Sequence, residues 1–479
     1  MRRLSTLVLA ILVAGLAAQL LRLGVLAPIL VVGVLLACNL AAARWRRVRN
    51  AAVENPRWYA GPLVVCWLVA TLLPMHQFSH EGITARGPAL TPESILELLL
   101  FVLVGFVALA VVRRLEPTLA LARPPAVLFL YPIWVSITCF WSATGPYALA
   151  RGLELCATAL LAWATVAVGR SDLAAMEAMV EVILRWFIRV TVVLVGLGVA
   201  FGPVYVLASA DNQDRFTWAG AHPLAAGVIL SVATVIAATA STRVLGVPVL
   251  VRAAMLGVFV AALVSNHSRQ SWAGLVAVYI VALALKGRLT PMLRRVGAPL
   301  AGAAAVAGFM YRREQLWSYV LRDGDPSTLL TGNGRLQLWG IGFRSLDTWF
   351  DWLNGLGFGV TRTLFTPEVF WAQTAHSSLL AVLVSTGLIG VGLFVALVLR
   401  PARDLLRDRS WARVEIGLTL TLLLLLVVIN GVVSDNLAIP NIGSSILFLI
   451  AAVGIVLRGE PLAAPAPQTA RVPVAQARK

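Results

Sequence analysis

Long apolar segments follow one another along almost the whole chain, and they restrict its fold more than any other feature. A helix that crosses a bilayer needs roughly 20 mostly apolar residues, and about 14 segments approach that length. These segments are residues 4–21, 23–43, 60–75, 94–112, 125–141, 147–168, 182–207, 222–241, 248–265, 270–285, 292–310, 376–399, 412–432 and 440–457. Because several of them are short, we expect about 12–14 membrane spans.

The composition supports a membrane protein. Hydrophobic residues make up 59% of the 479 residues and charged residues 13%, whereas a soluble domain has about 45–50% and about 25%. These proportions exclude a soluble globular protein, a disordered chain and a fibrous repeat. The sequence shows no period-two alternation, and an open sheet edge cannot face lipid. The sequence therefore predicts an all-α fold, a polytopic transmembrane helical bundle.

The chain is strongly basic, with 39 Lys and Arg against 22 Asp and Glu and a formal net charge of +17. In a soluble protein such a surplus would indicate nucleic acid. Here the basic residues gather in alternate loops, among them Arg44–Arg49, Lys286–Arg295 and Arg400–Arg413. Cytoplasmic loops of membrane proteins carry this bias. We therefore place both termini in the cytoplasm and expect no nucleic-acid partner.

One long loop and a polar tail interrupt the spans. Residues 311–375 form the only long loop predicted on the outer face, and its segment from Arg335 to Leu353 predicts an amphipathic helix in the membrane interface. The tail, residues 458–479, is rich in Pro and Ala and is expected to be disordered. We divide the rest into N-terminal transmembrane helices, residues 1–210, and a second transmembrane region, residues 211–457.

The sequence gives no clear sign of a bound metal, a disulfide or a cleaved leader. Cys38, Cys66, Cys139 and Cys156 all lie in apolar runs without metal-ligand spacing, so we expect them to be packing residues. The pair Asp323-Gly324-Asp325 precedes a proline and favours a turn over a metal site. No small-residue cleavage site follows the first apolar run, which we take as the first span.

Five polar residues that are suited to catalysis or anion binding come from five different loops on the predicted outer face. They are Arg215, Arg269, Arg335, His376 and Asp435. Each has an ordinary alternative, because an arginine at a span end often reaches to the lipid headgroups, and a lone His or Asp often caps a helix. Together they have the chemistry of a phosphate site, since guanidinium groups bind phosphate bidentately and a neutral imidazole accepts a proton near pH 7.

A longer motif surrounds one of these residues. His376-Ser377, nine further residues, and then Gly387-Leu388-Ile389-Gly390 fit the pattern H-[NSQ]-x9-G-x-x-G. In this pattern the chain resembles the O-antigen ligase and O-antigen polymerase superfamily, over roughly residues 205–440. Weaker elements of that family accompany it in order: Arg215 to Gly220 with His222-Pro223, then Ser268-Arg269, then Gly334-Arg335 with Trp339.

The resemblance implies a GT-C type glycosyltransferase of the bacterial inner membrane, with its active site on the periplasmic face and residues 211–457 as its catalytic region. Such enzymes move a glycan from an undecaprenyl-pyrophosphate donor to an acceptor hydroxyl, and they need no metal or other cofactor. The resemblance makes His376 the base and Arg215, Arg269 and Arg335 the pyrophosphate-binding residues. Supporting residues are Asp435, Trp339 and His222, whereas Gly387 and Gly390 are expected to pack the His376 helix against a neighbour.

Several functions fit these residues. We favour an O-antigen ligase with a lipid A-core acceptor, which acts in lipopolysaccharide biosynthesis. An O-antigen or exopolysaccharide polymerase or a protein O-glycosylating relative fits as well, and His376 would serve equally to orient the acceptor or contact phosphate. A lipid-linked sugar transporter is the alternative from another class. It should show internal repeats and ionisable residues in mid-membrane, but we find no repeat, and Glu97, Glu154 and Glu181 lie near span ends.

Overall fold

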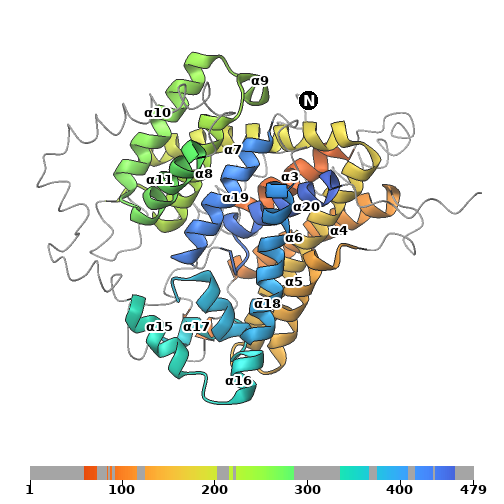
Figure 1. The fold of residues 1–479 in the computed structure, drawn as a ribbon, viewed down its shortest axis with the longest axis vertical. Helices are drawn as coiled ribbons and strands as arrows, with labels where there is room; N and C mark the ends of the chain where they lie inside the picture. Colours follow the sequence, from red (N-terminus) through yellow and green to blue (C-terminus); the bar gives the residue numbers. More distant parts are fainter. Residues whose placement is uncertain are drawn as a thin grey trace, which may run out of the picture.

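The computed structural model describes residues 59–72, 83–84, 87–88, 92–115, 124–201, 215–218, 223–284, 335–365, 375–407, 416–434 and 437–458. Over these ranges the protein is a bundle of α-helices (Figure 1), which confirms the predicted all-α class. The exception is a small antiparallel ladder, in which β1 (Ile83–Thr84) pairs with β2 (Gly87–Pro88). The sequence analysis did not predict this ladder, which is too short to cross a membrane.

The main helices of the bundle match the predicted spans wherever the structure describes them. They are α3 (Ala60–Leu72), α4 (Pro92–Leu115), α5 (Ala126–Ile137), α6 (Gly145–Ser171), α7 (Leu173–Phe201), α8 (Pro223–Thr239), α10 (Val249–Asn266), α11 (Arg269–Ala284), α18 (Ser378–Arg407), α19 (Gly417–Val432) and α20 (Ile442–Leu457). The predicted spans 4–21, 23–43 and 292–310 lie outside the described residues. Of the described helices, five are long and apolar enough to cross a bilayer, and the chain is a multi-pass membrane protein.

Shorter elements connect or flank these helices. The turn η3 (Thr138–Phe140) follows α5, and α9 (Thr242–Leu245) precedes α10. Three more helices, α15 (Arg335–Arg344), α16 (Trp349–Asn354) and α17 (Thr361–Leu364), come from the long loop. They lie together at one end of the bundle, the bottom in Figure 1, which we call the loop end.

The start of α7 differs from the prediction, which placed this span at residues 182–207. The helix begins at Leu173, because Asp172 caps it: its Oδ1 accepts a hydrogen bond of 3.0 Å from the amide of Ala175. An Asp at this position satisfies amide groups that a helix start leaves unpaired. The first turns of α7 carry Glu177 and Glu181 among apolar residues, and the predicted span began after these two acidic residues.

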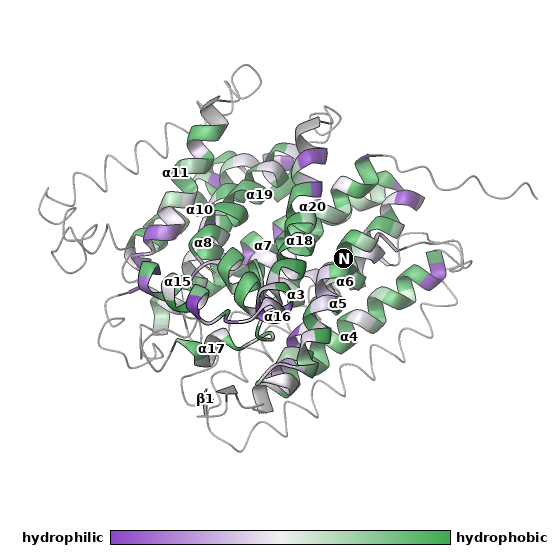
Figure 2. Cartoon of the chain, turned by 60° about the horizontal axis from the view of Figure 1, so that its bottom comes forward, coloured by the Kyte–Doolittle hydropathy of each residue, from purple (hydrophilic) through white to green (hydrophobic). Residues whose placement is uncertain are grey.

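Close backbone contacts hold the centre of the bundle together. Helix α6 packs against α4, α5, α7 and α20. At Gly152 a β-carbon would lie 2.7 Å from the Cα of Ser136, so α5 and α6 touch through their backbones. Such approaches favour helix association where lipid surrounds the protein. Figure 2 shows mainly hydrophobic residues along the helices, and Phe106 of α4 is 66% exposed, as suits a side chain that faces lipid.

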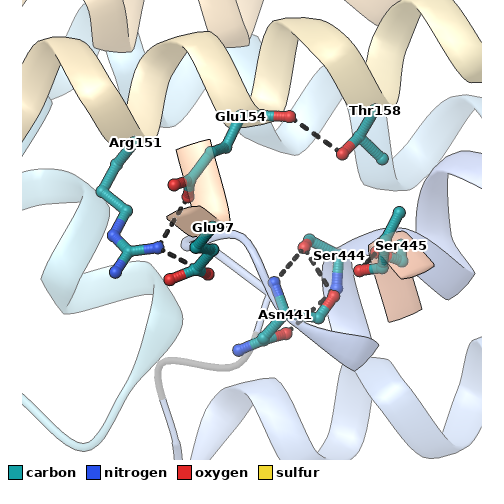
Figure 3. Close-up of polar contacts among 8 residues, drawn as sticks. Glu97, Arg151, Glu154, Thr158, Asn441, Ser444 and Ser445 are labelled. Atoms are coloured by element: carbon teal, nitrogen blue, oxygen red, sulfur yellow. Dashed lines mark hydrogen bonds and ion pairs between the residues drawn. The ribbon is translucent and has the colours of Figure 1, made fainter. Parts of the chain in front are cut away.

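A buried ion cluster joins α4 to α6. Nη1 of Arg151 donates to Oε1 of Glu97 at 2.9 Å and to Oε2 of Glu154 at 2.6 Å. All three residues are buried. Figure 3 shows the cluster beside the N-terminus of α20, where Asn441 caps the helix. The sequence analysis noted Glu97 and Glu154 but did not recognise Arg151 as their common partner.

The single amphipathic helix predicted from Arg335 to Leu353 is wrong, because the structure has two helices there. Helix α15 ends at Arg344, and α16 begins at Trp349 with a capping box. In this box the Thr348 side chain accepts from the amide of Asp351, and Oδ2 of Asp351 accepts from the amide of Thr348. These reciprocal bonds start a new helix. Trp349 and Phe350 are 74% and 54% exposed, so they present an apolar surface at the loop end.

Candidate functional site

The turn between α10 and α11 holds the first two candidate arginines. Only His267 and Ser268 separate the two helices, and His267 adopts a left-handed conformation with φ 55°. Arg269 is therefore the first residue of α11. Nε of Arg215 donates to the carbonyl of Asn266 at 2.9 Å, so Arg215 is fixed to the same turn.

Asn266 organises this turn. Its Nδ2 donates to the carbonyl of Phe216 at 2.7 Å and to that of Pro223 at 2.9 Å. The amide of Phe216 donates in return to the carbonyl of Ser265 at 2.8 Å. At Gly227 of α8, a β-carbon would lie 2.7 Å from Oδ1 of Asn266, so α8 packs directly on the turn. The sequence analysis missed the role of Asn266, although a polar residue in a tight interhelical turn is a usable signal.

Arg335, the first residue of α15, lies within electrostatic reach of Arg269. Burial and the positive charge of Arg269 both lower the pKa of the Arg335 guanidinium below its ordinary value. Within the described part of the chain, no carboxylate forms an ion pair with Arg335. The fold thus brings the charges of Arg269 and Arg335, on two helices far apart in sequence, within range of each other. Arg215 is attached to the turn that carries Arg269.

Helix α15 also reaches the loop that carries His376. Nε1 of Trp339 donates to the carbonyl of Ala375 at 3.2 Å. Trp339 lies one turn after Arg335 on the same face of α15, since residues four apart are neighbours on a helix. Leu338 and Ile341 pack with Ala375 and Leu380 in a separate apolar cluster. The position of Arg335 relative to the His376 loop is therefore fixed by packing as well as by a hydrogen bond.

The sequence predicts a span that begins at His376. In the structure His376 precedes α18, which begins at Ser378. It is half-buried and has φ 48°, the left-handed conformation that few non-glycine residues adopt. Ser378, the first residue of α18, donates from its Oγ to the carbonyl of Ser434 at 2.7 Å and accepts from the amide of Leu437 at 3.1 Å. Backbone strain of this kind often occurs at functional sites.

Two supporting residues of the prediction, His222 and Asp435, lie outside the described residues, as do Asp323 and Asp325. The neighbours of Asp435 are described, and the contacts of Ser378 place Ser434 and Leu437 against the start of α18. Among the residues that the structure describes, no group of three or more His, Cys, Asp or Glu is arranged to hold a metal. Over the same residues, the cysteines Cys66, Cys139 and Cys156 are free.

The glycines of the motif lie where the long loop meets α18. Gly387 has φ 67° and ψ −169°, so it breaks the helix. A β-carbon there would collide with the carbonyl of Leu353 and the amide of Asn354. Beside the break, the amide of Leu356 donates to the carbonyl of Val384 at 2.8 Å. The neighbour of Gly387 is thus the C-terminal turn of α16, which agrees with the expected packing of the His376 helix against another helix.

Gly390 lies one turn further along α18. A β-carbon at Gly390 would collide with the side chain of Thr386 and lie 3.3 Å from Cδ1 of Trp134. Nε1 of Trp134, on α5, donates to the carbonyl of Thr386 at 2.9 Å. The two glycines therefore allow both the long loop and α5 to approach α18 closely.

A comparison of the chain with models of known protein families finds no match, and no curated protein is significantly similar to it in sequence.

Proposed function

We propose that this protein is a glycosyltransferase of the bacterial inner membrane that takes its glycan from undecaprenyl pyrophosphate at the periplasmic face. The observation that carries the proposal is the pair of arginines, Arg269 and Arg335, beside the loop that holds His376. The His376 motif, in which the chain resembles the O-antigen ligase superfamily, adds independent support. A multi-pass membrane bundle also suits a donor that is attached to a membrane lipid.

The arginine pair favours a diphosphate ligand for an electrostatic reason. Two guanidinium groups whose charges act on each other repel, and partial burial of Arg335 increases the cost of its charge. A diphosphate between them would replace repulsion by charge-assisted hydrogen bonds, which are among the strongest that proteins make. The planar fork of arginine fits phosphate oxygens better than the point charge of lysine. Arg215 is fixed to the same turn and would contribute a third cation.

The proposed reaction is a single displacement with inversion. An acceptor hydroxyl attacks the anomeric carbon of the sugar on the donor and forms the new C–O bond. The bond from that carbon to the pyrophosphate oxygen breaks, and the electron pair leaves with undecaprenyl pyrophosphate. His376 takes the hydroxyl proton, while Arg269, Arg335 and Arg215 stabilise the leaving group. General-base catalysis of this kind contributes roughly 10²–10⁴-fold.

Among the acceptors we favour lipid A-core sugar, which makes the protein an O-antigen ligase. The same residues suit a polymerase that transfers the glycan to another repeat unit. The two differ in what accumulates in a deletion strain, which is lipid-linked polymer for a ligase and single repeat units for a polymerase.

Transfer of labelled glycan from a purified lipid-linked donor, in detergent with EDTA present, tests the proposal. We expect the wild type to transfer and His376→Ala to lose at least about 100-fold in rate, with an unchanged melting temperature. Arg344→Gln serves as a control for loss of charge, because Arg344 is exposed at the far end of α15. Movement of the lipid across a vesicle membrane without any transfer would instead identify a transporter.

A further inference from the structure

Two buried carboxamides, one on α11 and one on α19, lack hydrogen-bond partners among the residues that the structure describes. Gln270, the second residue of α11, is 7% exposed, and Asn430, near the end of α19, is 1% exposed. Within the part of the chain that the structure describes, neither the oxygen nor the nitrogen of either side chain has a partner. Native proteins retain few such groups, because each one carries its full desolvation cost. A partner from outside the chain would satisfy both amides.

The two carboxamides belong to facing surfaces of neighbouring helices. Helices α11 and α19 pack against each other. At Gly274 of α11, a β-carbon would lie 3.2 Å from Nδ2 of Asn430, so the Asn430 side chain rests on the backbone of α11. Gln270 precedes Gly274 by four residues and shares its face of the helix. Gln270 therefore lies about one turn from Asn430, toward the loop end.

Both carboxamides adjoin the proposed catalytic residues. Gln270 directly follows Arg269, whose charge acts on Arg335. On the other side, Gly431 directly follows Asn430, and a β-carbon at Gly431 would lie 3.4 Å from Oγ of Ser378. Ser378 is two residues from His376. Gln270 is thus one residue along α11 from an arginine of the site, and Asn430 is one residue along α19 from a contact with the start of α18.

We propose that Gln270 and Asn430 bind the sugar attached directly to the diphosphate of the donor, an assignment that rests on the proposed function. This sugar joins the phosphate oxygens to the anomeric carbon under attack, so it must lie between the arginines and the base. Its hydroxyl groups both donate and accept hydrogen bonds, as a carboxamide does. After transfer the sugar is gone and the amides are again unpaired, which weakens the binding of the lipid product and favours its release.

Affinity for undecaprenyl pyrophosphate with and without its first sugar tests this assignment in the full-length protein. We expect the wild type to bind the glycosylated lipid at least about tenfold more tightly, the effect of roughly one or two good hydrogen bonds. Gln270→Met and Asn430→Leu keep the side-chain size but remove the polar atoms. Each should abolish most of this preference and leave affinity for the sugar-free lipid unchanged. Gln337→Met, at an exposed position of α15, should keep the full preference.

Stability separates ligand binding from an internal role. Since the amides lack partners in the described chain, the two apolar variants should melt at the wild-type temperature or higher. Variants that keep the wild-type preference would overturn the assignment. If they do not fold, the wild type is tested with a donor whose first sugar is fully O-methylated, and an undiminished affinity would overturn it too. A wild type that binds neither lipid contradicts the proposed function itself.

Discussion

In the described part of the bundle, two clusters of buried or half-buried arginine differ in which charges act on the cation. In the α4–α6 cluster (Figure 3), Nη1 of Arg151 contacts Glu97 at 2.9 Å and Glu154 at 2.6 Å. The guanidinium also lies 5.3 Å from the ring centre of Tyr147. At the loop end, the like charge of Arg269 acts on Arg335. The first cluster neutralises its arginine within the chain and holds two helices together. The second concentrates positive charge, which fits a site for an anionic ligand.

The largest effect should come from removing the cation of the α4–α6 ion cluster, Arg151. Arg151→Met leaves Glu97 and Glu154 buried against each other without their cation, so we expect a loss of about 3–5 kcal/mol of stability. Thermal unfolding in detergent measures it, with Arg170→Met at the end of α6 as the control. Donor affinity per folded molecule should not change. A fully stable Arg151→Met protein would show that the ion cluster does not hold α4 and α6 together.

A substitution in the pair of Arg269 and Arg335 should lower the transfer rate and leave stability unchanged. Arg335→Lys keeps the charge but loses the planar fork, so we expect a loss of about 2–4 kcal/mol of transition-state stabilisation. The matching measurement is the transfer rate at saturating acceptor, with Arg344→Lys as the control. The melting temperature should stay within about one degree of the wild type, since Arg335 has no ion pair in the described chain. Equal rates for Arg335→Lys and wild type would indicate that bulk charge suffices.

A substitution at the junction between α18 and the long loop should lower both the stability and the transfer rate. Gly387→Ala places a β-carbon on the backbone of Leu353 and Asn354 and forces a residue with φ 67° to carry a side chain. We expect a loss of roughly 1–3 kcal/mol of stability together with a lower transfer rate, because α15 and His376 shift relative to each other. Gly392→Ala is a suitable control, since a β-carbon there meets nothing within 4 Å. Identical behaviour of the two variants would exclude the junction as a positioning element.

The smallest effect should come from the start of α16. Thr348→Ala removes the side chain of the capping box, which costs about 1 kcal/mol. Because α16 is short and exposed, we expect local fraying, a melting temperature near the wild type and a transfer rate reduced less than tenfold. Proteolysis at residues 345–349 measures the fraying. An unaltered cleavage rate would show that the box does not stabilise α16.

The sequence determined the helices better than it determined their contacts. Apolar length alone predicts every described span, because lipid requires it. The break between α15 and α16 was missed, since the apolar residues Trp339, Phe343, Leu346 and Phe350 keep a helical spacing across it. The capping box of Thr348 and Asp351 was present in the sequence as a signal of that break.

The residue types of the candidate site could be predicted from the sequence, but which of these residues lie near one another could not. Arg269 and Arg335 are 66 positions apart in the sequence, and only folding brings their charges together. Asn430 was overlooked although it interrupts a run of Leu, Val and Ile, where a polar residue is a sign of function. The contact of Asn430 with α11 depends on tertiary packing, which the hydrophobic periodicity of the sequence does not predict.

The most direct test of the anion site is the affinity of the purified protein for sugar-free undecaprenyl pyrophosphate. We predict that Arg335→Gln binds this lipid about 10- to 100-fold more weakly than the wild type, as expected for lost charge-assisted hydrogen bonds. Arg344→Gln should bind as the wild type does. Equal affinity of wild type and Arg335→Gln for this lipid would contradict the proposed anion site, because Arg335 would then not bind the diphosphate.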